Sequence, residues 1–123
     1  MENNENSISP NVSVLWQDVK ADVEQKIISG EYAAGERIPS IRKIADSYNI
    51  SLSTAQKVLQ VLRQEDIIES KRGVGYYVKP YIREKLLTER KKQLEKMVQL
   101  VSEEAAMIGV DIVTMIKRYT GEV

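Results

Sequence analysis

Residues 39–59 read PSIRKIADSYNISLSTAQKVL, and their alternation of apolar and polar positions is the most informative pattern in this chain of 123 residues. Apolar residues recur at three- and four-residue spacing from Ile41 to Tyr48 and again from Ala55 to Leu62. Each stretch predicts a short helix with one apolar face, and the polar break at Asn49 separates the two. Two such helices around a shared core are typical of a helix-turn-helix.

The residues at the predicted helix ends agree with this interpretation. Ser40 follows Pro39 and is a good N-cap, and Asn49 tolerates the left-handed conformation with which the first helix would end. Either Ser51 or Ser53 can cap the second helix. The sequence therefore predicts a tight turn between two short helices.

The outward face of the second helix carries almost only hydrogen-bonding side chains, and no acidic residue occurs between Ile50 and Arg63. Hydroxyl groups can bond phosphates or base edges, Gln can pair with adenine, and Lys can reach guanine or phosphate. We therefore expect this face to lie in the major groove of DNA. The alternative is an ordinary solvated helix face, which polar residues produce by default.

Residues 67–78, IIESKRGVGYYV, favour the first of these interpretations. Two β-prone runs flank a turn that contains Lys71, Arg72, Gly73 and Gly75, so the segment predicts a hairpin with a basic tip. A helix-turn-helix followed by such a hairpin is a winged helix, whose wing can enter a minor groove or hold a phosphate. The alternative is a surface hairpin whose basic pair only keeps it soluble.

These residues resemble the GntR family of transcription regulators. Four segments carry the resemblance: Ile27 to Gly30, Gly35 to Ala45, Ile50 to Thr54 and Gly73 to Val78. Ile41 stands where the family usually has an acidic residue. In this respect the chain is similar to the short YtrA-type branch. Leu52 stands where many members have an Arg that reads guanine, so the DNA sequence preferred by those members does not transfer to this chain.

The resemblance implies roles for individual side chains. Arg42 would contact the DNA backbone or a base, and Arg72 and Gly73 would act at the wing. With the polar and basic residues around the second predicted helix, the candidate DNA-binding residues are Arg37, Ser40, Arg42, Ser51, Leu52, Ser53, Thr54, Gln56, Lys57, Arg72 and Gly73.

Composition neither proves nor excludes this function. The net charge is zero, with 18 basic and 18 acidic residues, whereas many DNA-binding domains are clearly basic. Acidic residues gather near the N-terminus, so a local basic patch can still serve the predicted surface. Because Cys, a membrane-length apolar run and a signal peptide are absent from the sequence, we expect a cytoplasmic protein without membrane contact, bacterial by the resemblance.

Three parts are expected along the chain: a flexible tail at 1–12, a winged-helix DNA-binding domain at 13–79 and a two-helix dimerisation segment at 80–123. An amphipathic helix from about Val14 to Ser29 would be the third helix of the winged domain. Trp16 on its apolar face is expected in the core rather than in a ligand site. The fold class is thus mostly α with a small β-hairpin, a winged helix-turn-helix head followed by a helical segment.

After Pro80 the pattern predicts a long helix to about Met107. Gly109 then breaks the pattern, and Asp111 is a plausible N-cap of a final short helix.

Apolar residues recur at seven-residue spacing within the long helix and form a stripe along one of its faces. Such a stripe needs a partner surface, and a second copy of the chain is the natural one. The alternative is a monomer whose helix folds back on its own head. The candidate dimerisation residues are Leu87, Leu94, Met97, Val98, Val101, Ile108, Ile112 and Ile116.

An enzyme is not expected, because the chain has no His and no Cys and so lacks the common general base, the thiol nucleophile and the usual zinc ligands. Neither catalytic residues, nor a metal site, nor a cofactor is predicted, and a small-molecule effector is left open. We expect a homodimeric, sequence-specific transcription regulator, a repressor, that binds double-stranded DNA at an inverted-repeat operator. Two alternatives remain: a winged-helix protein-interaction module without DNA binding, and a protein whose helical stripe is its main function.

Overall fold

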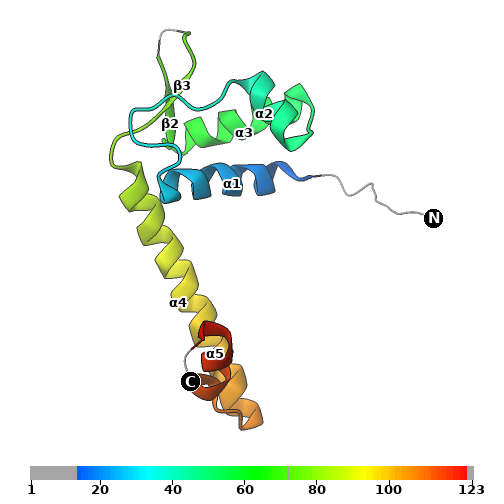
Figure 1. Ribbon diagram of the computed structural model, residues 1–123, viewed down its shortest axis with the longest axis vertical. Coiled ribbons are helices and arrows are strands. Elements are labelled where there is room, and N and C mark those ends of the chain that lie inside the picture. The colour runs from blue at the N-terminus through cyan, green and yellow to red at the C-terminus, as the bar shows by residue number, and fades with distance from the viewer. Residues whose placement is uncertain (1–13, 72, 122–123) are drawn as a thin grey trace, which may run out of the picture. The chain divides into compact units, whose positions relative to one another are not determined.

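The computed structural model describes residues 14–71 and 73–121. The predicted tail, residues 1–12, and Arg72 lie outside this described part. The order of elements is α1 (Trp16–Ser29), α2 (Ile41–Tyr48), α3 (Leu52–Gln64), β2 (Ile68–Ser70), β3 (Tyr76–Val78), α4 (Ile82–Ile108) and α5 (Ile112–Thr120) (Figure 1). This confirms the expected fold class, a mostly helical chain with one antiparallel β-hairpin.

The chain divides into two compact units, one up to Leu86 and one from Leu87. The first turn of α4 belongs to the first unit, where Ile82 is buried and Leu86 packs against the core. Arg83 adds a hydrogen bond, its Nε donating to the Ile28 carbonyl oxygen at 2.7 Å. The winged-helix unit therefore extends into the helix that follows the hairpin.

Helix α1 begins at Trp16, two residues after the predicted start at Val14. Its four-residue repeat of Val19, Val23 and Ile27 is fully buried, because these side chains share one face of the helix. The helix packs against α3 and ends at Gly30, whose φ of 91° only glycine adopts without strain.

The helix-turn-helix has the predicted capping residues. Ser40 Oγ accepts a hydrogen bond from the Lys43 amide at the start of α2. Asn49 ends that helix with a φ of 53°, and Ser51, rather than Ser53, caps α3 by accepting from the Thr54 amide. These caps fix the turn because each satisfies an amide that the helix itself leaves without a partner.

Helix α3 is central to the core of the first unit and contacts α1, α2 and β2. Three of its side chains, those of Ala55, Val58 and Leu62, are completely buried. The stripe that buries them fixes the rotation of α3, so its opposite, polar face is exposed. The core positions of the remaining elements are Val19, Val23, Ile27, Ile38, Ile44, Ala45, Ile67, Ile68, Val78 and Ile82.

The hairpin β2–β3 follows α3 directly (Figure 1), and the segment before α2 pairs with the other edge of β3. Strands β2 and β3 pair with Ile68 opposite Val78. On the other edge of β3, the Ile38 amide donates to the Tyr76 carbonyl and the Val78 amide donates to the Glu36 carbonyl, both at 2.9 Å. The bridge of Arg37 to Tyr77 of β3 was not predicted, because residues 35–38 contain no β-prone alternation.

The second unit consists of α4 from Leu87 onward and α5. Gly109 has a φ of 72° and ends α4, after which Asp111 accepts hydrogen bonds from the Val113 and Thr114 amides, as predicted. The Thr114 side-chain and backbone hydrogen bonds lower the pKa of the Asp111 carboxyl group. None of the described helices is both long and apolar enough to cross a membrane.

Candidate nucleic-acid interface

The N-terminus of α3 carries a cluster of hydroxyl groups. Ser51 Oγ lies 3.0 Å from Ser53 Oγ and 2.8 Å from Thr54 Oγ1, in addition to its bond with the Thr54 amide. All three oxygens therefore stand at the positively polarised end of the helix, a place that favours an approaching phosphate. Leu52, the first residue of α3, is 47% exposed between them.

The start of α2 places a second group of candidate residues on the surface. Ser40 is exposed while it caps the helix, and Arg42 and Lys43 follow on the first turn with exposed side chains. Helix α2 is tied to α1 through Tyr48, whose hydroxyl donates to the Asp22 carboxylate and accepts from Lys26 Nζ at 3.2 Å. This tie holds the orientation of α2 within the head.

Asp22, Lys26 and Tyr48 form a hydrogen-bonded group, the Tyr48 cluster, in which the pKa values of Lys26 and Tyr48 are shifted. Partial burial, followed by the hydrogen bond with Asp22, raises the pKa of the Tyr48 hydroxyl. The hydrogen bond to Tyr48 is the largest cause that raises the pKa of the Lys26 ammonium. Both shifts favour the protonated groups that make these contacts in the folded chain.

The polar face of α3 opens onto a groove beside the hairpin. Gln56, Gln60, Arg63 and Gln64 line it from the helix, and Tyr76 lines it from β3. The groove has a volume of about 440 Å³ and is open to solvent. The exposed flank of α3 and the strand of the wing therefore face the same space.

The wing has a tight turn at its tip. The Val74 amide donates to the Lys71 carbonyl at 2.9 Å, and Gly73 has a φ of 71° with no atom near the place of a Cβ. Lys71 Nζ lies 4.8 Å from the centre of the Tyr77 ring, a cation–π contact that holds the ammonium group along the hairpin. The predicted contact Arg72 lies outside the described residues.

Arg37 lies at the base of the wing, against Gly75. A Cβ added at Gly75 would stand 2.6 Å from Arg37 Nε, and the φ of Gly75 is 129°. The backbone of Arg37 is bridged to Tyr77 of β3. The side chain thus packs over a glycine of the wing while it remains exposed to solvent.

Among the described residues, the candidates Arg37, Arg42 and Lys57 form no ion pair with an acidic side chain. Ion pairs there join Lys20 to Glu24 and Glu65, Lys26 to Asp22, and Lys79 to Asp66. Those pairs engage lysines outside the candidate set. Although the net charge is zero, the cationic groups of Arg37, Arg42 and Lys57 are therefore available to an anion.

Lys57 differs from the other candidates in its surroundings. Its Nζ lies 5.3 Å from the centre of the Trp16 ring at the start of α1. Trp16 packs at the edge of the hydrophobic core, in agreement with the expectation that it is a core residue. Lys57 is exposed, so this contact orients its ammonium group toward α1 rather than toward the wing.

The described candidate residues lie on the first turn of α2, on the first two turns of α3, and at the wing with its base at Arg37. The groove adds Gln60, Arg63, Gln64 and Tyr76, which were not among the candidate residues. The spacing of Gln60 and Arg63 from Gln56 is the signal that identifies them, because residues four and seven apart share a helix face.

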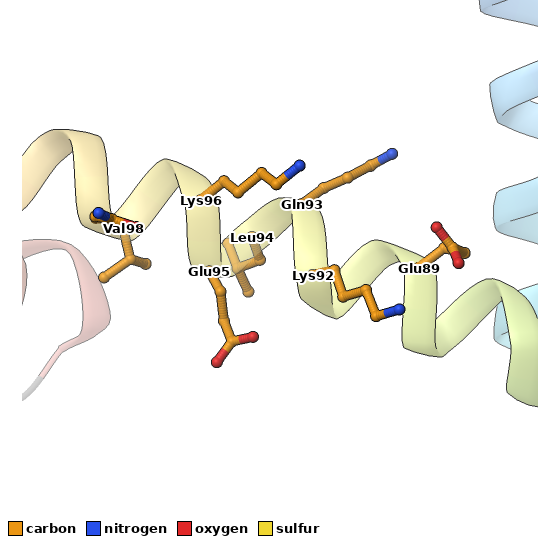
Figure 2. A pocket seen from close by; sticks show the side chains of 8 residues that line it. Glu89, Lys92, Gln93, Leu94, Glu95, Lys96 and Val98 are labelled. Atoms are coloured by element: carbon orange, nitrogen blue, oxygen red, sulfur yellow. The ribbon is translucent and has the colours of Figure 1, made fainter.

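The candidate dimerisation residues lie in the second unit and are largely exposed in the single chain. Leu87 and Ile112 are half-buried, whereas Leu94, Met97, Val98, Val101, Ile108 and Ile116 are exposed. Figure 2 shows the short Leu94 side chain among the charged ends of Lys92, Glu95 and Lys96 on α4. Nearer the end of α4, an apolar hollow of about 280 Å³ is lined by Leu100, Val101, Glu104, Ala105, Ile108, Val110, Ile112 and Met115.

Comparison with solved structures supports the fold. A GntR family transcriptional regulator from Listeria monocytogenes superposes with a TM-score of 0.73 at 21% identity, over 94% of this chain and all of that one. S. agalactiae BusR, solved in complex with its busAB-promotor DNA, superposes with a TM-score of 0.53 at 27% identity, over 87% of this chain and 58% of that one.

Comparison with curated sequences identifies relatives of the winged-helix unit. The Exu regulon transcriptional regulator of Escherichia coli K12 is 33% identical over 64 residues, which are 52% of this chain. The match covers 25% of that relative's own length. The model of the bacterial regulatory proteins of the gntR family matches residues 15–78, from the start of α1 to the end of the wing. On the strength of that match, the chain belongs to the gntR family of bacterial regulatory proteins.

Proposed function

We propose that this protein is a sequence-specific DNA-binding transcription regulator, a repressor, that acts as a homodimer on an inverted-repeat operator. The observation that carries the proposal is the common groove of α3 and the wing, lined by Gln56, Gln60, Arg63, Gln64 and Tyr76. A single duplex can touch both elements only if they face the same space. The family membership and the promoter complex of BusR support the same class of ligand.

Within this proposal, α3 enters the major groove with its N-terminal turn first. Gln56 is the candidate for a bidentate contact with adenine, while Ser51 and Ser53 bond phosphates or base edges. Arg42 on α2 contacts the backbone beside the groove. At the wing, Gly73 allows close approach of the backbone, and Arg72 enters the neighbouring minor groove or holds a phosphate.

The second unit supports self-association. Leu94, Met97 and Val101 expose roughly half of their surface or more, and such a row of apolar groups is stabilised when a second copy covers it. A two-fold dimer presents two copies of α3 to one face of DNA. The half-sites of the operator would then lie about 34 Å apart, or a larger whole number of helical turns.

We also place the chain in the short, YtrA-like branch of the family. Ile41 supports this placement, since it opens α2 with an apolar, half-buried side chain where an acidic residue is usual. An apolar residue at this position packs against the core rather than adding negative charge beside the DNA-facing Arg42.

Selection of bound duplexes from a random pool, followed by sequencing, tests the proposed function. Enrichment of an inverted repeat with half-sites one or more whole turns apart is the expected result. Gln56→Ala should weaken binding to the selected duplex by about 1–3 kcal/mol per head. Lys117→Ala, which changes an exposed residue of α5, is the control and should bind with unchanged affinity.

The second candidate function is a winged-helix module that binds another protein. The zero net charge and the exposed Leu52 favour it. If the selection retains no duplex above background, DNA binding is rejected and the protein-interaction function replaces it.

A further inference from the structure

Leu52 is the one large apolar side chain of α3 that is exposed. The other large aliphatic residues of α3 are buried or half-buried, whereas Leu52 is 47% exposed at the first position of the helix. Water covers its surface in the free chain, which is unfavourable for an aliphatic group. A partner surface with an apolar group would remove this cost.

The helix geometry places Leu52 on the same face as the groove. Residues 52, 56, 60 and 63 follow a spacing of four, four and three, so their side chains form one row along α3. Gln56, Gln60 and Arg63 of this row line the groove. Leu52 is thus the N-terminal member of the row proposed to face DNA.

The polar neighbours of Leu52 already bond one another. Ser51 Oγ contacts Ser53 Oγ at 3.0 Å and Thr54 Oγ1 at 2.8 Å, which fixes the helix end around the leucine. An aliphatic side chain offers no hydrogen bond to a base edge. The apolar group that a base edge presents in the major groove is the C5-methyl group of thymine.

We propose that Leu52 determines specificity by contacting the methyl group of a thymine in each half-site. The inference rests on the proposed DNA-binding function and adds the base that the N-terminus of α3 selects. At one position of each half-site, T·A is then preferred because its methyl group packs against the leucine. At the same place cytosine has only a hydrogen on C5 and the purines present the acceptor N7, so no other base offers the methyl contact.

The test compares thymine with uracil, which differ only by this methyl group. Duplexes are first selected with the wild-type chain and with Leu52→Ala, and the position at which the variant loses its preference for thymine is identified. Replacing that thymine by uracil should weaken wild-type binding about threefold to fivefold per half-site, the value of one buried methyl group. Leu52→Ala should bind the two duplexes equally.

Leu15→Ala is the matched control, because Leu15 is a 57% exposed leucine of the same unit that precedes α1 and belongs to neither α3 nor the wing. It should keep the wild-type ratio of thymine to uracil binding. An equal uracil effect in the wild type and in Leu52→Ala would overturn the inference, as would a selected half-site without any Leu52-dependent thymine. If neither protein retains a duplex, the DNA-binding function itself fails, and this inference fails with it.

Discussion

The guanidinium group of Arg37 lies against Gly75, with Nε only 2.6 Å from the position that a Cβ on Gly75 would take. Arg37 precedes α2 in the sequence and Gly75 precedes β3, so this contact joins the entry to the helix-turn-helix with the base of the wing. The glycine leaves the space in which the guanidinium group lies. The positive charge is thereby held at the base of the wing.

The Arg37–Gly75 contact predicts that substitutions of the two residues have coupled effects on DNA binding. Arg37→Ala should weaken DNA binding, and Gly75→Ala should weaken it as well because the new methyl group displaces the guanidinium group. The double variant should lose less than the sum of the single losses, as expected for residues in contact. Fluorescence anisotropy with the selected duplex measures all three, and additive losses would contradict a shared role.

Gly75→Ala should also destabilise the fold, by about 1–3 kcal/mol, since alanine is strained at a φ of 129°. Denaturation in urea separates this effect from the change in DNA affinity, and binding is compared under conditions where every variant is folded.

The cap of α3 predicts a stability effect that depends on a single hydroxyl. Ser51→Ala removes the oxygen that accepts from the Thr54 amide and should lower the free energy of unfolding by about 1 kcal/mol. Ser53→Ala removes a neighbouring exposed hydroxyl without removing the cap and should cost clearly less. Equal losses in urea denaturation would show that Ser51 is not the cap in solution.

The caps illustrate which parts of the fold the sequence could predict. Ser40, Asn49 and the Gly109–Asp111 break act through their immediate neighbours, so their roles follow from local rules. The pairing of residues 35–38 with β3 and the packing of Arg37 on Gly75 join segments far apart in the chain. No local pattern encodes these contacts, and they became visible only in the folded structure.

The candidate site was predictable to a similar extent. The first turns of α2 and α3 were identified from their polar residues, which the apolar stripe of each helix forces outward. Whether Gln60, Arg63 and Tyr76 line one groove depends on the angle between α3 and the hairpin. That angle is a property of packing, and the sequence pattern alone does not specify it.

The Tyr48 cluster predicts a loss of stability in alkaline solution. The folded chain raises the pKa of Tyr48 above its ordinary value of 10.0, so the stability that this group contributes is complete below pH 10.0 and is lost as the pH rises through the folded value. Lys26 acts in the same direction above its ordinary value of 10.5, because its pKa is raised by the same hydroxyl. The free energy of unfolding should therefore fall as the pH rises above 10.

Tyr48→Phe should make this fall shallower, since it removes the hydroxyl that links Asp22 and Lys26. Tyr119→Phe, which removes an exposed hydroxyl in α5, is the matched control. Urea denaturation at a series of pH values measures the slope for each protein. A slope that Tyr48→Phe leaves unchanged would assign the alkaline loss to other groups.

The apolar stripe of α4 predicts that a single charge disrupts self-association. Leu94→Lys should shift the protein from dimer toward monomer, because a lysine in the dimer interface would be buried without a partner. Gln93→Lys adds the same charge at the adjacent, exposed position and should leave the dimer intact. Sedimentation velocity compares the two, and a stable Leu94→Lys dimer would show that Leu94 lies outside the interface.

The salt dependence of DNA binding tests most directly the claim that this protein binds duplex DNA through its phosphates. For about 6–10 phosphate contacts per dimer, affinity for the selected duplex should fall by roughly 10³–10⁵ between 50 and 200 mM salt. Arg42→Ala, which removes one cation per head, should reduce the steepness of this dependence. An affinity that does not change with salt, or the absence of binding to any duplex, would contradict the account.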